Sequence, residues 1–206
     1  MKVPVHLGVL LSGGGRTLQN LLDRIEDGSL AARVEVVVSS HPDAQGLERA
    51  RKKGIPAHVV NYREFPDPES FSLSVTQALR RHAVDLVVMG GFIRKYLIPP
   101  EYEGRVLNIH PALLPKHGGR GFYGHRVHEA VLAAGEKESG CTVHFADDRY
   151  DQGQVILQKR VPVLPGDTPE TLAERVFQAE CEAYPEAIEQ VAGRAAKSKI
   201  PTPKSQ

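Results

Sequence analysis

The stretch of sequence that decides the fold is residues 7–25, LGVLLSGGGRTLQNLLDRI. Residues 7–11 are apolar and predict a buried strand, while the leucines and the isoleucine of residues 18–25 fall on one stripe of a helix. A glycine-rich loop, residues 12–17, joins the two. This order of strand, glycine turn and helix brings backbone N–H groups and the positive end of a helix together, which favours binding of a phosphate.

The same alternation of short apolar runs and helix-period segments continues along the chain. We expect further strands at residues 34–38, 58–60, 86–89 and 106–110, and helices at 46–53 and 71–82. Then follow a glycine-rich loop at 116–124, a helix at 126–134, strands near 141–145 and 155–161, and a final helix at 169–189. The pattern predicts an α/β fold with a Rossmann-like, mostly parallel sheet and helices on both faces.

Length and composition set further limits. The 206 residues suit one domain, which we place at residues 1–192. Residues 193–206 have too little apolar material to pack, so we expect a disordered basic tail.

The net charge of +1 and the lack of a long apolar run argue against a nucleic acid or membrane partner. Two cysteines without metal or redox spacing favour a cytoplasmic location. No feature isolates a self-complementary surface, which leaves a homodimer open.

The glycine loop matches neither of two familiar nucleotide-binding patterns. It lacks the Gly-Lys-Ser/Thr of a Walker loop, and Leu18 stands where the dinucleotide fingerprint has its third glycine. A tight turn with no ligand is the alternative interpretation. Arg16 favours the phosphate, because a guanidinium beside exposed amides is a strong phosphate partner, and Thr17 can cap the helix and offer a hydroxyl.

Polar residues end the strand at 106–110. Asn108 and His110 point to the same side because side chains alternate along a strand. An Asn amide can stabilise an oxyanion and a His can move a proton near neutral pH, which together suit acyl transfer. Asp151, in the loop between the last two strands, could orient His110. The alternative is that these residues satisfy loop backbone groups, and for Asp147 we favour a solvated turn on pattern alone.

Neither a metal site nor a covalent nucleophile is expected. His125, His128 and Glu129 do not form His-Glu-x-x-His, so we expect no metal. Cys141 and Cys181 occur in no glycine-rich elbow and are interpreted as packed thiols. Direct transfer between two bound substrates is therefore the economical mechanism.

Five motifs carry a resemblance to a known family: LSGGG at 11–15, DAQGLERA at 43–50, GGFIR at 90–94, LNIHPALLP at 107–115, and the segment 140–156. Together they make the chain, up to about residue 193, similar to the phosphoribosylglycinamide formyltransferases. These folate-dependent enzymes are also called glycinamide ribonucleotide transformylases. The resemblance implies the formyltransferase fold. It also implies transfer of a formyl group from 10-formyltetrahydrofolate to the amine of glycinamide ribonucleotide in purine biosynthesis, with small-molecule substrates and no metal.

The resemblance also implies roles for individual residues. It assigns the catalytic role to Asn108, His110 and Asp151. The residues that bind glycinamide ribonucleotide become Gly14, Gly15, Arg16, Thr17 and, near the amine, Glu180. The residues that bind the folate become Ile93, Arg94, Leu97, Asn108, Asp147 and Asp151, with His144 in support. The tetrahedral oxyanion would be stabilised by Asn108 and protonated His110, and Asp151 would raise the proton affinity of His110.

The chain also departs from many members of that family. They read Gly-Asn-Gly-Ser-Asn where this chain has GGGRT at 13–17, and an arginine that some place before the third helix aligns near Pro68. Asp-Gly-Gly-Pro becomes DQGQ at 151–154. Two alternatives stay open: a related enzyme that uses water or methionyl-tRNA as acceptor, and a non-catalytic nucleotide-binding module. Such related enzymes normally carry an additional domain, for which we expect 206 residues to leave no room.

Overall fold

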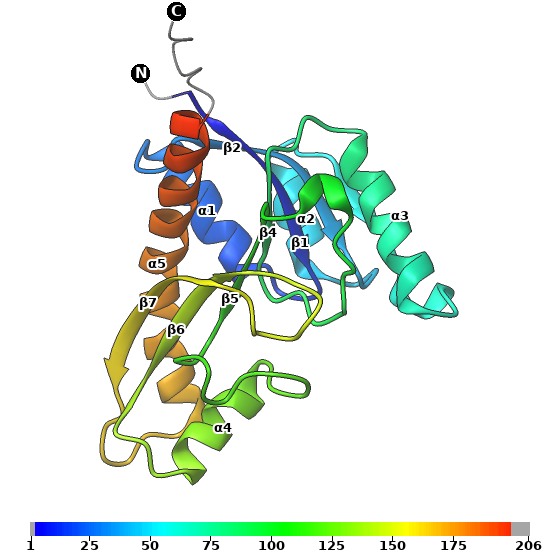
Figure 1. Cartoon of the computed structure of the whole chain (residues 1–206). Helices are drawn as coiled ribbons and strands as arrows, with labels where there is room; N and C mark the ends of the chain where they lie inside the picture. The colour runs from blue at the N-terminus through cyan, green and yellow to red at the C-terminus, as the bar shows by residue number, and fades with distance from the viewer. Residues whose placement is uncertain (1–2, 199–206) are drawn as a thin grey trace, which may run out of the picture.

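The computed structural model describes residues 3–198. Within them a seven-stranded sheet has the order β3-β2-β1-β4-β5-β6-β7 (Figure 1). The strands are β1 (Val5–Leu11), β2 (Ala32–Ser39), β3 (Ala57–Val59), β4 (Leu86–Met89), β5 (Val106–His110), β6 (Glu138–Phe145) and β7 (Val155–Pro162). The first five strands pair in parallel, and β6 and β7 add antiparallel pairs. The predicted mostly parallel sheet is confirmed.

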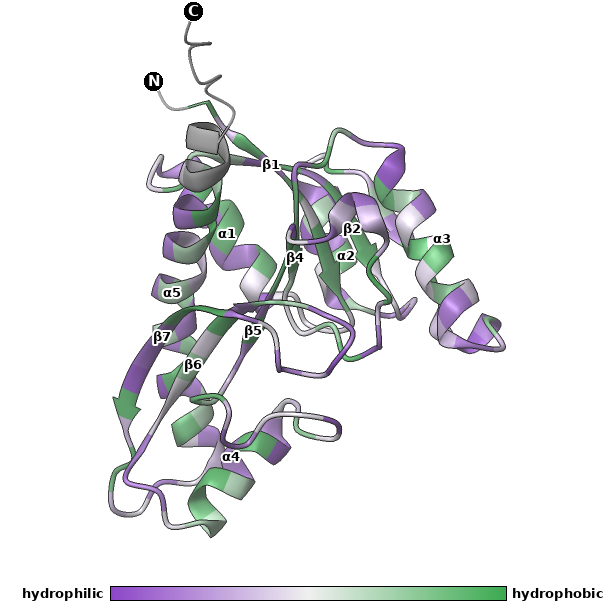
Figure 2. Ribbon diagram, viewed as in Figure 1, coloured by the Kyte–Doolittle hydropathy of each residue, from purple (hydrophilic) through white to green (hydrophobic). Residues whose placement is uncertain are grey.

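Helices cover both faces of the sheet. They are α1 (Arg16–Glu26), α2 (Gln45–Lys52), α3 (Pro68–Arg80), α4 (His125–Ala133) and α5 (Pro169–Ser198), with short 3-10 helices η1 (Tyr62–Glu64) and η2 (Pro100–Tyr102). Side chains alternate between the two faces along β1: Val9 packs in the core beneath α1, α2 and α5, whereas Leu10 packs in the core beneath α3. The central strands are accordingly the most hydrophobic part of the fold (Figure 2).

The position of β1 in the sheet creates a site for a ligand. The chain runs from β1 outward to β2 and β3, then returns to the other side of β1 with β4 and β5. In an open α/β sheet the crevice at this reversal lies outside the carboxyl ends of the strands, and this is where ligands bind. The glycine loop follows β1, and His110 ends β5. The topology therefore brings the two sequence motifs to one edge.

The end of the chain differs from the expectation. Helix α5 is described to Ser198, beyond the expected end at residue 189, so its last turns occupy part of the segment 193–206 that we expected to be disordered. Alanine and basic residues are good helix formers, and each residue added to an existing helix gains a hydrogen bond. Residues 199–206 of the expected tail lie outside the described residues. Among the helices of residues 3–198, none has the length and apolarity of a membrane span.

Candidate active site

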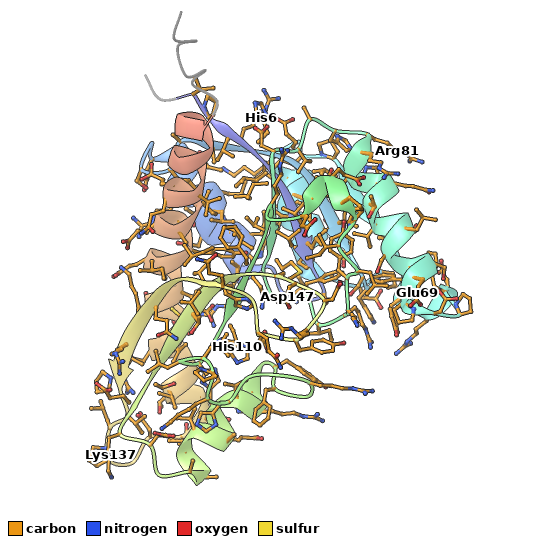
Figure 3. All side chains as sticks on the ribbon, viewed as in Figure 1. His6, Glu69, Arg81, His110, Lys137 and Asp147 are labelled. Carbon is orange, nitrogen blue, oxygen red and sulfur yellow. The ribbon has the colours of Figure 1, made fainter. Side chains whose placement is uncertain are left out.

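A pocket of about 1040 Å³ opens at the carboxyl edge of the sheet. It is bounded by the start of α1, the segment after β4, the end of β5, the glycine-rich loop before α4, the β6–β7 loop and α5. Of the residues predicted for the site, its wall contains Arg16, Thr17, Ile93, Arg94, Asn108, His110, Asp147, Asp151 and Glu180. Gly14, Gly15 and Leu97 are not part of this wall. Figure 3 shows His110 and Asp147 near the centre of the molecule, with Glu69, Arg81 and Lys137 at its periphery.

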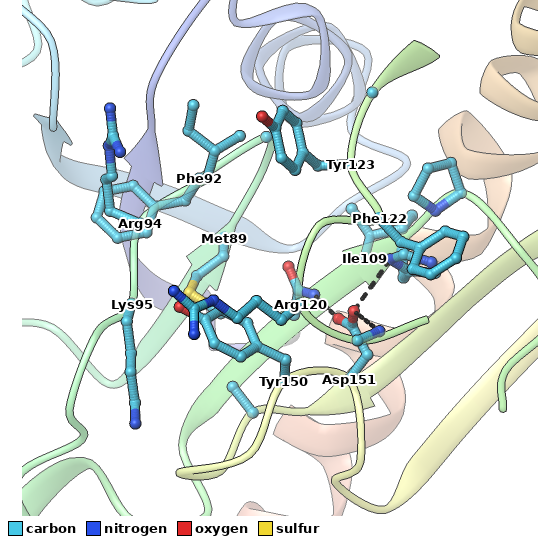
Figure 4. A pocket seen from close by; sticks show the side chains of 18 of the residues that line it. Met89, Phe92, Arg94, Lys95, Ile109, Arg120, Phe122, Tyr123, Tyr150 and Asp151 are labelled. Carbon is cyan, nitrogen blue, oxygen red and sulfur yellow. Dashed lines mark hydrogen bonds and ion pairs between the residues drawn. The ribbon is translucent and has the colours of Figure 1, made fainter. Parts of the chain in front are cut away.

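The three residues predicted to be catalytic meet in one corner of the pocket, which we call the His110 corner. Figure 4 shows Asp151 in this corner, with its interactions as dashed lines. The Nδ2 atom of Asn108 donates a hydrogen bond to Oδ1 of Asp151 at 3.3 Å. Nδ1 of His110 lies 3.5 Å from the other carboxylate oxygen, Oδ2. Asn108 and His110 come from β5, whereas Asp151 comes from the β6–β7 loop. Their convergence makes a shared polar site out of segments about 40 positions apart.

Unusual backbone conformations accompany this corner. Among the described residues, the non-glycine residues with positive φ are His117 and Asp151, both at 54°. The carbonyl of His117 accepts a hydrogen bond from Nε2 of His110 at 2.8 Å, and the Gly119 amide donates to Oδ2 of Asp151 at 2.9 Å. Such conformations cost about 1–3 kcal/mol each and cluster at functional sites. Both strained residues thus hold groups that surround His110.

Burial governs the protonation of His110. The residue is only 4% exposed, and this burial lowers its pKa, although the charge of Asp151 acts in the opposite direction. Asp151 thus acts on the proton affinity of His110 in the expected direction, but desolvation of the imidazolium outweighs the carboxylate, so the net change in the pKa is a decrease. For Asp151, burial alone would raise the pKa, yet contacts with His144 and His110, which favour the carboxylate when either ring is protonated, and the hydrogen bond from the Gly119 amide together lower it. The corner thus holds a neutral imidazole beside an ionised carboxylate at pH 7.

His144, which the sequence analysis gave only a supporting role, contacts Asn108 directly. It lies opposite Asn108 in the antiparallel register of β5 and β6. Its Nδ1 atom donates to the carbonyl of Phe145 at 2.8 Å, so Nε2 is free to accept a hydrogen bond from Nδ2 of Asn108 at 3.1 Å. The two hydrogens of the Asn108 amide are therefore directed at His144 and Asp151, which fixes its orientation.

The first turn of α1 and the side of α5 form the opposite end of the pocket. Arg16 donates to Oε2 of Glu174 at 2.6 Å and stacks on the ring of Phe177 at 3.7 Å. Its guanidinium is thus held by α5 rather than left free beside the glycine loop. Burial raises the pKa of Glu180 to about 8, with the charge of Arg16 opposing the rise, so this carboxyl is mostly neutral at pH 7.

The predicted folate residues lie on the pocket wall, except for the half-buried Leu97. Arg94 lies over the ring of Tyr62 at 4.5 Å, and Ile93 is about half exposed, at 47%. Pro68, where some family members have an arginine, is also on the wall. Leu97 lies away from the wall and its amide donates to Oγ of Ser72 on α3 at 2.9 Å. Because this contact with α3 sets the position of Leu97, the sequence around Leu97 could not predict that it lies away from the pocket.

Several wall residues were not predicted for the site. They are aromatic and basic side chains on the loops around it, including Tyr62, Arg120, Phe122, Tyr123 and Tyr150. Three of them, Arg120, Phe122 and Tyr123, lie in the glycine-rich loop that the sequence shows before a helix. The sequence did not predict that this loop lies beside the pocket, because its position depends on the tertiary structure. Within residues 3–198, no group of three or more His, Cys, Asp or Glu side chains has the arrangement to hold a metal ion.

Comparison with known proteins finds related sequences and structures. The family model described as formyl transferase matches residues 5–188. A glycinamide ribonucleotide transformylase 1 from Symbiobacterium toebii is 39% identical, with a TM-score of 0.85 over 94% of this chain and 91% of that one. The chloroplastic phosphoribosylglycinamide formyltransferase of Arabidopsis thaliana is 40% identical over 88% of this chain and 63% of its own length.

A further similarity is to part of a much longer protein. The trifunctional purine biosynthetic protein adenosine-3 of Drosophila pseudoobscura pseudoobscura is 42% identical over 187 residues. These cover 89% of this chain but 13% of the fly protein. The chain therefore corresponds to one segment of that protein.

Proposed function

The chain belongs to the formyl transferase family, and from this premise we propose that it transfers a formyl group from 10-formyltetrahydrofolate to the amine of glycinamide ribonucleotide. The observation that carries the proposal is the convergence of Asn108, His110 and Asp151 in the pocket that also contains Glu180. The family relationship supports the reaction, and the step belongs to purine biosynthesis. The folate is a co-substrate that gives up its formyl group.

In the proposed reaction, the amine of glycinamide ribonucleotide attacks the formyl carbon. A tetrahedral intermediate forms, and its oxyanion takes a hydrogen bond from the amide of Asn108, in place of the 3.3 Å bond to Asp151. That bond is the longer of the two that Asn108 donates, since the contact with His144 is 3.1 Å. His144 keeps the amide oriented while the oxyanion is bound.

The proton then moves through His110. Nε2 carries a hydrogen because it donates to the His117 carbonyl, so Nδ1 of the neutral imidazole is the atom that takes up the proton lost by the attacking amine. Asp151, 3.5 Å away, stabilises the imidazolium that results. The proton passes to the folate nitrogen as the bond between that nitrogen and the formyl carbon breaks. The new bond joins the amine nitrogen to the formyl carbon, so atoms and charge balance.

The remaining residues bind the two substrates in this proposal. Gly14, Gly15, Arg16 and Thr17 bind the phosphate of glycinamide ribonucleotide. Glu180 lies near its amine, and a neutral carboxyl there leaves the amine uncharged and nucleophilic, whereas an ionised one would hold it as an ammonium. Ile93, Arg94 and Asp147 bind the folate together with the residues of the His110 corner, whereas Leu97, which lies away from the pocket wall, makes no direct contact.

Three other expectations remain predictions. We propose that residues 1–192 act as one formyltransferase domain in the cytoplasm. The homodimer left open by the sequence is to be measured by sedimentation at several protein concentrations. None of these points alters the assignment of substrates.

An absorbance assay tests the proposed reaction. With a 10-formyl folate donor and glycinamide ribonucleotide, the donor should be consumed only when the amine is present. Water and methionyl-tRNA serve as alternative acceptors in parallel reactions. Donor loss without glycinamide ribonucleotide, or transfer to methionyl-tRNA, would show that the acceptor is wrong. Binding of both ligands without turnover would instead identify a non-catalytic module.

A further inference from the structure

Helix α2 contacts the glycine loop through the backbone carbonyls of the loop. The Nε atom of Arg49 donates to the carbonyl oxygen of Gly14 at 2.9 Å, and the amide of Gly46 donates to the carbonyl oxygen of Gly13 at 3.1 Å. Both donors belong to the segment 43–50, which the sequence analysis singled out as a motif and which the proposed reaction does not use. Two successive carbonyls of the loop are thus turned toward α2.

The direction of these carbonyls sets the direction of the amides. In a trans peptide, the C=O of one residue and the N–H of the next point to opposite sides. The Gly13 and Gly14 carbonyls face α2, so the N–H groups of Gly14 and Gly15 face away from it. Within the described residues no acceptor takes either N–H group. A side chain added at Gly14 would also meet nothing within 4 Å, so the loop is open around the Cα of Gly14.

Arg49 also ties the loop to α1. Its Nη1 atom donates to Oε1 of Gln19 at 2.9 Å, and the amide of Gln19 donates to the Gly15 carbonyl at 2.9 Å. The close approach of the two helices depends on glycine, because a Cβ at Gly15 would lie 2.6 Å from Cα of Gly46. One guanidinium therefore fixes both the loop and the helix start that follows it.

We propose that Arg49 is a positioning residue for the phosphate of the acceptor substrate. It holds the N–H groups of Gly14 and Gly15 toward the anion before the substrate arrives, without touching the reacting atoms. The inference rests on the proposed function, because it assigns to Arg49 the preorganisation of the phosphate site named there. Preorganised donors bind an anion more tightly because the loop loses less conformational freedom on binding.

The test compares Arg49→Met and Arg49→Lys with Arg51→Met, a matched control. Arg51 lies on the same helix and pairs with Glu48 at the surface, so its loss removes the same charge without touching the loop. For Arg49→Met, the KM for glycinamide ribonucleotide should rise about tenfold while kcat stays within about twofold, since the loss is in binding. The KM for the dephosphorylated acceptor should not change. Arg49→Lys, which keeps the charge and one donor, should fall between Arg49→Met and wild type.

Two results would overturn this role. An unchanged KM for glycinamide ribonucleotide in Arg49→Met is one, and an equal rise for the phosphorylated and dephosphorylated acceptors is the other, because it would show general damage to the fold. Calorimetry with inorganic phosphate keeps the test separate from the proposed function. If the wild type transfers no formyl group, the reaction assignment fails, but weaker phosphate binding by Arg49→Met than by Arg51→Met still supports the positioning role. Equal phosphate binding by these two variants overturns it.

Discussion

The glycine loop and the His110 corner lie at the same edge of the sheet but are built in different ways. The loop offers backbone amides, and the segments that shape it, the loop itself, α1 and α2, follow one another within residues 12–52. The corner offers side chains from β5, β6 and the β6–β7 loop together with backbone groups of the loop before α4, and it includes both non-glycine residues with positive φ among the described residues. Both regions need packed elements, since Arg49 lies 35 positions from Gly14 and Asp151 lies 43 positions from Asn108. They differ in the groups they offer, which are backbone amides in the loop and side chains in the corner.

The two regions also differ in their electrostatics. His110 is nearly inaccessible to solvent, so burial decides its protonation. Arg16 and Glu174, at the other end of the pocket, have side chains that are 53% and 54% exposed. Water screens such a pair, which makes it weak and easily exchanged for a phosphate. Changes in the corner should therefore act mainly on turnover, and changes near the loop on binding or folding.

The largest effect is expected from Asn108→Ala, which removes a side chain of the corner. Turnover should fall by ~10²–10³, because the oxyanion loses a preorganised donor. Steady-state kinetics should show the loss in kcat, with the KM for glycinamide ribonucleotide within about threefold of wild type. A normal kcat with a raised KM would show that Asn108 acts on binding, and would contradict the expectation that the corner acts mainly on turnover.

Asp151→Asn should lower turnover by about tenfold to a hundredfold and shift the titration of His110. In the wild type, burial places the pKa of His110 below its ordinary value of 6.5, while Asp151 partly offsets the decrease. Loss of the carboxylate should therefore move this pKa further down, which NMR titration of the imidazole measures. An unchanged pKa would mean that Asp151 does not interact electrostatically with His110, and a shift upward would mean that the carboxylate does not stabilise the imidazolium.

Gly15→Ala should affect folding. At φ +69° a side chain is strained, and its Cβ would approach Cα of Gly46 to 2.6 Å. We expect the free energy of unfolding to fall by about 1–3 kcal/mol in urea denaturation. Gly14→Ala is the control, because a Cβ there meets nothing within 4 Å, and it should cost less than about 1 kcal/mol. Equal losses for the two variants would show that α1 and α2 do not depend on their close approach at Gly15.

The smallest effect is expected from Glu174→Gln, which releases Arg16 from its partner on α5. Since an exposed ion pair contributes little, the KM for glycinamide ribonucleotide should fall by at most about fivefold as the guanidinium becomes available to phosphate. Glu182→Gln is the matched control, because Glu182 lies on the same helix and pairs with Lys159 instead. A rise in KM specific to Glu174→Gln would mean that the pair itself orients Arg16 for binding.

Much of the fold could be predicted from hydrophobic periodicity. The predicted limits of β4 and β5 match the structure, and α1 and α2 differ by one or two residues at each end. The end of α5 was missed because a polar helix and a disordered tail have similar compositions. In the site, Asn108 and His110 could be found from their alternation on one strand, whereas the place of Asp151 depends on how the β6–β7 loop folds back.

The sequence by itself determined the α/β alternation, the position of the glycine loop and the pairing of Asn108 with His110 on one strand, because these depend on residues close together in the chain. Only the tertiary structure decided that Arg16 is held by Glu174, 158 positions away, and that burial lowers the pKa of His110 by more than Asp151 raises it. The physical reason is that partners distant in the chain, and the removal of water from a charged group, arise only when the elements pack together.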